Sequence, residues 1–172
     1  MNTIAQLDPQ IVWKNFYSLT QIPRPSKFEN EAAQFICDFG KNLGLESFRD
    51  EIGNVIIRKP ATPGMEDRMG VILQAHVDMV PQKNNDVEHD FKKDPIKPRI
   101  VDNMVYATGT TLGADNGLGD ATIMAILEST DIPHPAIEAL FTIDEETGMT
   151  GAMGLQGGML EGQILLNLDT EE

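Results

Sequence analysis

Two stretches near the N-terminus carry apolar residues at the three- and four-residue spacing of amphipathic helices. The first is residues 7–19, where Asp8 can cap the helix and Pro9 suits its first position. The second runs from about Phe28 to Leu43 and stops at Gly44. Its buried stripe is predicted at Ala32, Phe35, Ile36, Phe39 and Leu43. Both helices therefore present one apolar face to a core.

Shorter apolar runs, which are typical of strands, follow these helices. Residues 46–50 and 54–59 indicate a pair of strands. Residues 96–109 indicate a hairpin that turns at Asp102 and Asn103. The segment between the two, "GVILQA" at residues 70–75, is a continuous apolar run, as in parallel strands that are buried on both faces.

The second half of the chain alternates between helix and strand patterns. A glycine-rich connection, "GTTLGADNGLG", leads into a predicted helix at residues 120–130. Two more apolar runs, residues 136–143 and 163–168, then indicate strands. The pattern predicts an α/β fold with a mixed, largely parallel sheet flanked by helices.

Polar residues gather where three of the predicted strands end. His76 and Asp78 follow "VILQA", Glu145 and Glu146 follow "ALFTID", and Asp169 follows "ILLNL". Singly, each is an ordinary turn residue or helix cap. Ligands of such sheets bind beyond the carboxyl ends of the strands, and so many carboxylates on one edge are destabilising unless a cation lies among them. Nitrogen and oxygen donors suit zinc, with manganese or cobalt as alternatives.

Composition narrows the range of partners and compartments. The 172 residues carry a formal net charge of −14, which argues against nucleic acid or an anionic membrane surface as a partner. Cys37 is the single cysteine, so no disulfide forms within the chain, and a cytoplasmic location is expected. The sequence shows neither an export signal nor an apolar stretch long enough to span a membrane.

Three motifs carry a resemblance to a known family. The segments "HVDMVP", "TTLGADNGLG" and "TIDEETGM" resemble those of the co-catalytic zinc metallopeptidases of the aminoacylase and carboxypeptidase type. With "HDFKKDPIKP", "EETGMTGAMGLQG" and "LNLDTEE", the chain is similar over nearly its whole length to the aminoacyl-histidine dipeptidases, also called cytosolic non-specific or Xaa-His dipeptidases. The resemblance implies that dipeptides are hydrolysed by a water molecule that is activated by two divalent metal ions. Zinc is the metal expected first.

The resemblance also implies metal ligands. His76 and Asp169 would bind one metal, Asp115 would bridge both, and Glu146 would bind the second. A peptide bond in the cis form is implied between Asp115 and Asn116. These residues come from separate segments of the chain, so the fold must bring them together.

Two further residues receive catalytic roles from the resemblance. Glu145 is implied to be the general base that takes a proton from the attacking water. Asp78 is implied to orient the imidazole of His76, because a ligating histidine works best when its second nitrogen is held. One glutamate of the pair must therefore stay free of the metal while its neighbour binds it.

The family pattern continues beyond the end of this chain. Family members go on into a lid or dimerisation domain and then return to the catalytic sheet, where a late histidine completes the second metal site. The other two histidines here, His89 and His134, are predicted to be solvated loop residues. Residues 1–172 are therefore expected to form the N-terminal part of the catalytic domain of a homodimeric enzyme, and to be inactive alone.

Three functions stay open from the sequence. The first is a metal-dependent dipeptidase acting on a small dipeptide. The second is an amide hydrolase of the same scaffold that acts on N-acyl amino acids, since its metal chemistry would be the same. The third is a metal-binding module without turnover.

Overall fold

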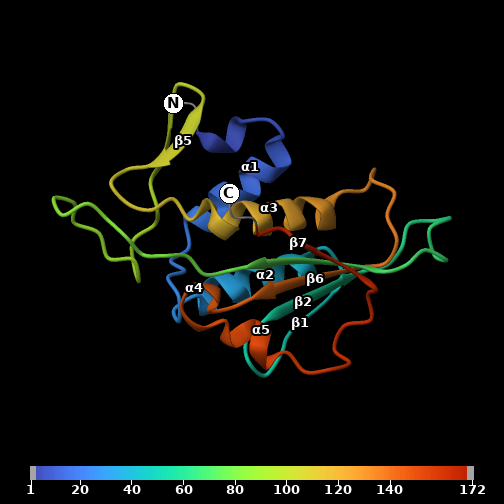
Figure 1. Ribbon diagram of the computed structural model, residues 1–172. Helices are drawn as coiled ribbons and strands as arrows, with labels where there is room; N and C mark the ends of the chain where they lie inside the picture. Colours follow the sequence, from blue (N-terminus) through green and yellow to red (C-terminus); the bar gives the residue numbers. More distant parts are fainter. Residues whose placement is uncertain (1–2, 170–172) are drawn as a thin grey trace.

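The centre of the protein is a five-stranded sheet, seen in a computed structural model that describes residues 3–169 (Figure 1). Its strand order is β1-β2-β6-β3-β7. The strands are β1 (Glu46–Arg49), β2 (Val55–Lys59), β3 (Val71–His76), β6 (Ile137–Thr142) and β7 (Ile164–Asn167). β3 runs parallel to both β6 and β7, whereas β2 is antiparallel to β6 and to β1. The predicted mixed, largely parallel sheet is confirmed.

Three long helices cover one face of this sheet. They are α1 (Gln10–Thr20), which follows a short 3-10 turn η1 (Ile4–Gln6), α2 (Asn30–Asn42) and α3 (Ala114–Glu128). The core that joins them to the sheet includes Phe16, Leu19, Ile36, Val55, Ile57, Leu73, Ile123, Met124 and Phe141. Because these strand residues alternate along β2, β3 and β6, they all point to the helical face.

The opposite face of the sheet is covered by a shorter segment. A smaller core of Ile56, Ile72 and Leu140 packs there against Leu155, Met159 and Leu160. This segment follows α4 (Glu145–Gly148) and α5 (Thr150–Gly154), and α5 lies across the sheet from α3 in Figure 1. Every residue of β6 is buried, because both faces of this central strand are covered.

A two-stranded hairpin stands apart from the main sheet. It consists of β4 (Pro98–Val101) and β5 (Met104–Ala107), and it turns at Asp102 and Asn103 as predicted. Asp102 has a φ of 54°, a left-handed conformation that aspartate tolerates better than most residues.

The buried stripe of α2 differs from the prediction. The buried residues are Ala32, Ala33, Ile36, Cys37 and Gly40, whereas Leu43 is 39% exposed. Phe35 and Phe39 are only half-buried. The helix turns its smallest residues toward the sheet, because a Cβ at Gly40 would lie 2.8 Å from Cδ1 of Ile57. Close approach of helix and strand therefore outweighs burial of the larger rings.

Two helices begin at residues other than those predicted. Asp8 makes no capping bond, because Pro9 occupies the extended N-cap position and α1 begins at Gln10. α3 begins at Ala114 rather than residue 120, with a break in its helical angles at Asp115. Two glycines of the predicted connection, Gly117 and Gly119, lie inside the helix, where they allow close packing. Within residues 3–169, no helix has both the length and the apolar character needed to cross a membrane.

The carboxyl ends of β3, β6 and β7 meet at one edge of the sheet, because these strands are parallel. The short helix α5 is fixed near that edge through Gly151. Its amide donates to the carbonyl of Ile143 at 3.2 Å, and its carbonyl accepts from the side-chain amide of Asn54 at 2.9 Å. A Cβ at Gly151 would lie 2.6 Å from backbone atoms of Ile143, so only glycine fits there.

We expect Gly151→Ala to lower the free energy of unfolding by about 1–3 kcal/mol, because backbone at residue 143 must move to make room. Chemical denaturation of the full-length protein measures this change. Gly157→Ala is the matched control, since a Cβ there meets nothing within 4 Å. Equal stability of the two variants would contradict the packing described for α5.

Candidate metal centre

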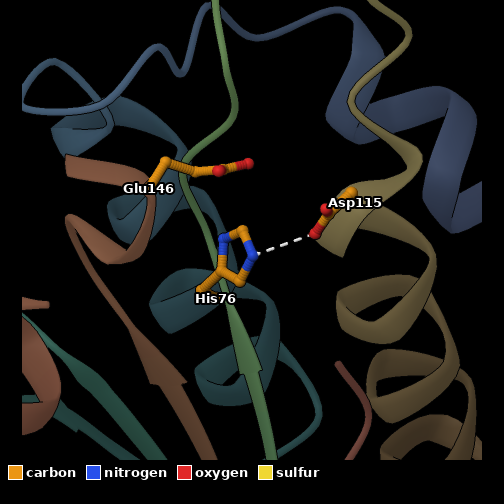
Figure 2. A group of neighbouring side chains, drawn as sticks. All are labelled: His76, Asp115 and Glu146. Atoms are coloured by element: carbon orange, nitrogen blue, oxygen red, sulfur yellow. Dashed lines mark hydrogen bonds and ion pairs between the residues drawn. The ribbon is translucent and has the colours of Figure 1, made fainter. Parts of the chain in front are cut away.

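His76 lies at the carboxyl end of β3, with only 1% of its side chain exposed. Its Nδ1 atom is 3.0 Å from the backbone carbonyl of Asp78 and 3.4 Å from the Oδ1 atom of the same residue. Its Nε2 atom is 3.1 Å from Oδ1 of Asp115 (Figure 2). One ring nitrogen is therefore held inside the protein, while the other faces the edge of the sheet.

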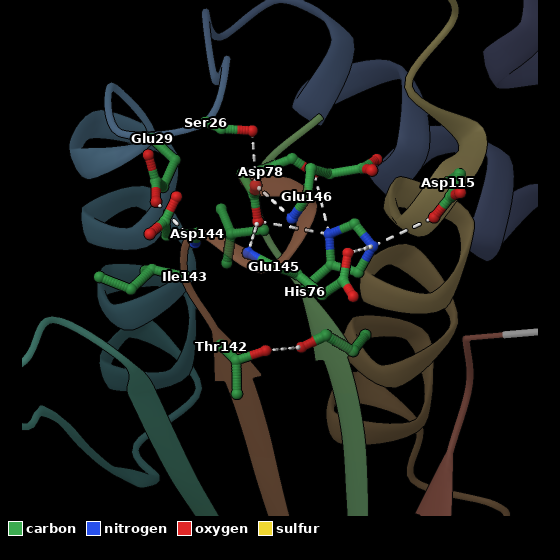
Figure 3. A network of polar contacts seen from close by, with 12 residues as sticks. Ser26, Glu29, His76, Asp78, Asp115, Thr142, Ile143, Asp144, Glu145 and Glu146 are labelled. Atoms are coloured by element: carbon green, nitrogen blue, oxygen red, sulfur yellow. Dashed lines mark hydrogen bonds and ion pairs between the residues drawn. The ribbon is translucent and has the colours of Figure 1, made fainter. Parts of the chain in front are cut away.

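Asp78 joins the end of β3 to the start of α4. Its carboxylate is completely buried and accepts from the Ser26 hydroxyl at 2.7 Å. It also accepts from the backbone amides of Glu145 at 2.9 Å and Glu146 at 3.2 Å (Figure 3). These bonds fix the paired glutamates beside the imidazole that Asp78 contacts.

Asp115, Glu145, Glu146 and Asp169 bring carboxylates toward His76. Oε2 of Glu145 and Oδ2 of Asp169 are each 3.7 Å from its Nε2 atom. Two overlapping groups result, namely His76 with Asp115 and Glu146, and His76 with Glu145 and Asp169. The donor atoms of each group lie within 4.8 Å of one another. The five residues come together as the sequence predicted, whereas their separate roles stay predictions.

The chemistry of this donor set fits a divalent metal. An imidazole nitrogen together with carboxylate oxygens is a set that zinc, manganese and cobalt all accept. The side chain of Asp115 is 70% exposed, so one carboxylate of the group is open to incoming ligands. His76 and the carboxylates are therefore suited to hold an ion at the solvent-exposed edge of the sheet rather than inside the core.

The backbone around Asp115 aims its carboxylate at His76. Gly113 has a left-handed φ of 69°, and the peptide between Asp115 and Asn116 is cis, as the family resemblance implied. Helical angles resume after Asn116. The chain therefore changes direction at Gly113 and within the first residues of α3, and the carboxylate of Asp115 points toward His76 (Figure 2).

Electrostatics in the cluster favour a bound cation. Burial alone would lower the pKa of His76, but the hydrogen bond and charge of Asp78 outweigh it and raise that pKa to about 9. Burial also raises the pKa of Glu145 and of Glu146, and the charges of neighbouring carboxylates add to the effect. Without a cation, the imidazole of His76 therefore keeps its proton at neutral pH.

The two remaining histidines lie outside both donor groups. His134 was predicted to be solvated, but this is wrong, since it is only 5% exposed. Its backbone amide bonds to the Thr62 hydroxyl at 3.0 Å and its Nδ1 atom is 2.7 Å from the Pro135 carbonyl, so the loop packs it inward. His89 is half-buried, with its ring edge-on to Phe91.

Sequence reasoning missed three residues that support the site. Ser26 bonds to Asp78, and Arg24 and Asp120 are buried beneath the cluster. The available signals were weak. Arg24 lies between two prolines in "IPRPS", and Asp120 is the one charged residue of the apolar stretch "DATIMAIL". The burial of these two charged side chains could therefore be recognised only once the fold was known.

A family model described as "Peptidase family M20/M25/M40" matches residues 72–169, which is more than half of the chain. The "Cytosol non-specific dipeptidase" of Escherichia coli (strain K12) is 52% identical over 172 residues. That alignment covers 100% of this chain and 36% of the relative. The chain thus spans about a third of the length of this relative.

Solved structures agree with the sequence comparison. Aminoacylhistidine dipeptidase from Vibrio alginolyticus superposes with a TM-score of 0.97 at 54% identity, over 99% of this chain and 35% of that one. Aminopeptidase PepT from Bacillus cereus ATCC 10987 superposes with a TM-score of 0.80 at 27% identity, over 96% and 44% of the two chains.

The raised pKa of His76 can be measured directly. In the metal-free protein, the imidazole should stay protonated at neutral pH and lose its proton near pH 9, as seen in an NMR titration of the ring. Asp78→Asn should lower this pKa, because it removes the carboxylate that holds Nδ1. A wild-type pKa at the ordinary value of about 6.5 would contradict the described contact with Asp78.

Proposed function

The chain belongs to peptidase family M20/M25/M40, and from this premise we propose that it forms the metal-binding part of a dipeptidase. The proposed reaction is hydrolysis of a dipeptide, with peptides ending in histidine as one substrate class, and it depends on two divalent metals such as zinc. Support comes from the relatives, whose names describe dipeptidases, and from the donor groups at the sheet edge.

The observation that carries the proposal is the position of the donor groups. They come from the ends of β3, β6 and β7 and from the start of α3, segments far apart in the sequence. No packing requirement of the core explains so many carboxylates around one buried imidazole, since like charges at this spacing repel one another. A site that binds cations explains their convergence.

We assign the metal ligands within these groups as the resemblance implied. His76 and Asp169 would hold one ion, Asp115 would bridge, and Glu146 would hold the second. When bound, the metals would polarise the scissile carbonyl and acidify the attacking water. Asp78 holds the inner nitrogen of the imidazole, so that the outer one stays directed at the site.

Glu145 is the proposed general base. Its backbone amide is fixed by Asp78, and its carboxylate lies 3.7 Å from Nε2 of His76 with 30% of the side chain exposed. It is therefore anchored at its backbone but open to solvent at its carboxylate. In this position it would accept a proton from water and pass it to the leaving amine.

We further propose that residues 1–172 represent the N-terminal part of the catalytic domain. The chain covers 36% of one dipeptidase relative and 35% of another. Chain beyond this part would supply the remaining ligand of the second metal, the lid and a dimer contact. Residues 170–172, the end of the "LNLDTEE" motif, lie outside the described residues. Turnover would require the full-length protein, because catalysis depends on precise placement of reacting groups.

We expect the full-length protein to hydrolyse Xaa-His dipeptides, to lose this activity on treatment with a chelator, and to regain it with zinc. Parallel assays on N-acetyl amino acids and on dipeptides identify the substrate class. Hydrolysis of the N-acetyl compounds alone would replace the dipeptidase assignment with a deacylase. Zinc binding without hydrolysis of either class would favour a metal-binding module.

The paired glutamates should respond differently to the same substitution. Glu145→Gln should keep its metal content but lower kcat about 10²–10⁴-fold, since it removes the base without removing a ligand. Glu146→Gln should lose metal. Elemental analysis and steady-state kinetics on the full-length variants measure both effects. If Glu145→Gln loses metal and Glu146→Gln keeps it, the two assignments must be exchanged.

A further inference from the structure

Beneath the donor groups, the side chain of Arg24 links two segments that carry predicted ligands. Arg24 is 2% exposed. Its Nη1 atom donates to the carbonyl of Val77 at 2.7 Å and approaches that of Asp78 at 3.5 Å, and its Nη2 atom donates to the carbonyl of Gly113. The first two carbonyls follow His76 on β3, and the third comes just before the turn at Asp115.

The planar guanidinium explains why arginine suits this position. It presents donors in a fixed fork, so one side chain can hold two backbone segments at a set separation. Lysine has one nitrogen on a flexible stem, and it cannot reproduce that geometry. The carbonyl of Asp78 also lies 3.0 Å from Nδ1 of His76, so the guanidinium and the imidazole approach the same oxygen.

The backbone is built closely around this side chain. A Cβ at Gly113 would lie 2.7 Å from Nη2 of Arg24, and one at Gly117 would lie 2.4 Å from the same atom. Glycine at both positions therefore allows the turn and the first residues of α3 to approach the guanidinium. The main chain of Arg24 is also fixed, since its carbonyl accepts from the amide of Met79 at 3.1 Å.

Asp120 is the buried acidic group nearest in effect to the guanidinium: burial raises the pKa of its carboxyl to about 7, and the charge of Arg24 opposes that rise. It is 0% exposed, and it lies on α3 one helical turn beyond Asn116. Both of its carboxylate oxygens are buried without a hydrogen-bond partner, as are Nε of Arg24 and Nδ2 of Asn116. Two unpartnered acceptors thus accompany two unpartnered donors. A guanidinium so deeply buried requires a compensating charge, and the charge of Asp120 is the strongest that acts on it.

We propose that Arg24 is a positioning residue which, with Asp120 as its counter-charge, sets the separation between His76 and Asp115 and thereby the metal affinity of the site. It does not contact the proposed substrate or metal, because its side chain is buried beneath the donor groups and its two Nη atoms donate to the carbonyls of Val77 and Gly113. The effect on metal affinity rests on the proposed function. The effect on the orientation of His76 does not.

Two buried groups of opposite charge with a merely structural role would behave differently from a positioning residue. Replacing both charges by apolar groups of similar size often leaves a protein as stable as before. The double variant Arg24→Met/Asp120→Leu should therefore fold, although it lacks the fork that holds the two segments. Arg24→Lys keeps the charge and loses only the geometry. Arg99→Lys is the matched control, since Arg99 is exposed on β4.

The experiment uses full-length wild-type and variant proteins with three readouts. Thermal unfolding reports stability, calorimetric titration with zinc reports affinity, and ¹⁵N NMR of the metal-free protein reports the His76 ring. We expect Arg24→Lys and the double variant to bind zinc at least tenfold more weakly and to shift the His76 ring signals. The double variant should unfold at a higher temperature than Arg24→Met alone, and Arg99→Lys should match wild type.

Each outcome decides a separate point. Wild-type zinc affinity and unchanged His76 signals in a stably folded double variant would overturn the positioning role. Restoration of affinity by Arg24→Lys would also overturn it, because charge without the fork would then suffice. If wild-type protein binds no zinc, the proposed function is wrong, and the ring signals of His76 in the metal-free variants still decide the role of Arg24.

Discussion

The site depends on one buried carboxylate, that of Asp78. A carboxylate taken out of water is stable only if hydrogen bonds replace its hydration. Here the Ser26 hydroxyl and the amides of Glu145 and Glu146 supply them. These donors come from two segments far from Asp78 in the sequence, so satisfying one charge fixes the end of β3 against the start of α4. The same residue contacts the imidazole of His76. The contacts that hold β3 against α4 therefore also hold the site residues in place.

The chain accepts a local excess of negative charge at the edge of its sheet. Parallel strands place their carboxyl ends together, so side chains from β3, β6 and β7 cannot avoid one another. Burial and neighbouring charges raise the pKa of both glutamates, which shows that the arrangement is unfavourable for the cluster by itself. A bound cation would neutralise the repulsion between the carboxylates, and the attraction between the cation and the carboxylates would contribute to binding. Stability and metal affinity are thus linked in the same few residues.

Much of this could be predicted from the sequence, because periodicity and strand ends report on local structure. The strands, the hairpin turn and the gathering of His76 with the carboxylates follow from such patterns. Other features depend on tertiary packing. The burial of Gly40 instead of Leu43 follows from the approach of α2 to the sheet, and the glycines at positions 113 and 117 follow from the close approach of Arg24 to the start of α3. The buried charge of Asp120 has no periodic signature at all.

The strand order also has a consequence for synthesis of the chain. β2 and β3 follow one another in sequence but are not neighbours in the sheet, because β6 lies between them. Their facing edges therefore stay unpaired until residues 137–142 have left the ribosome. Nascent chains of this protein would expose apolar strand edges over that interval, which is the state that holdase chaperones bind and that leads to aggregation when they are scarce.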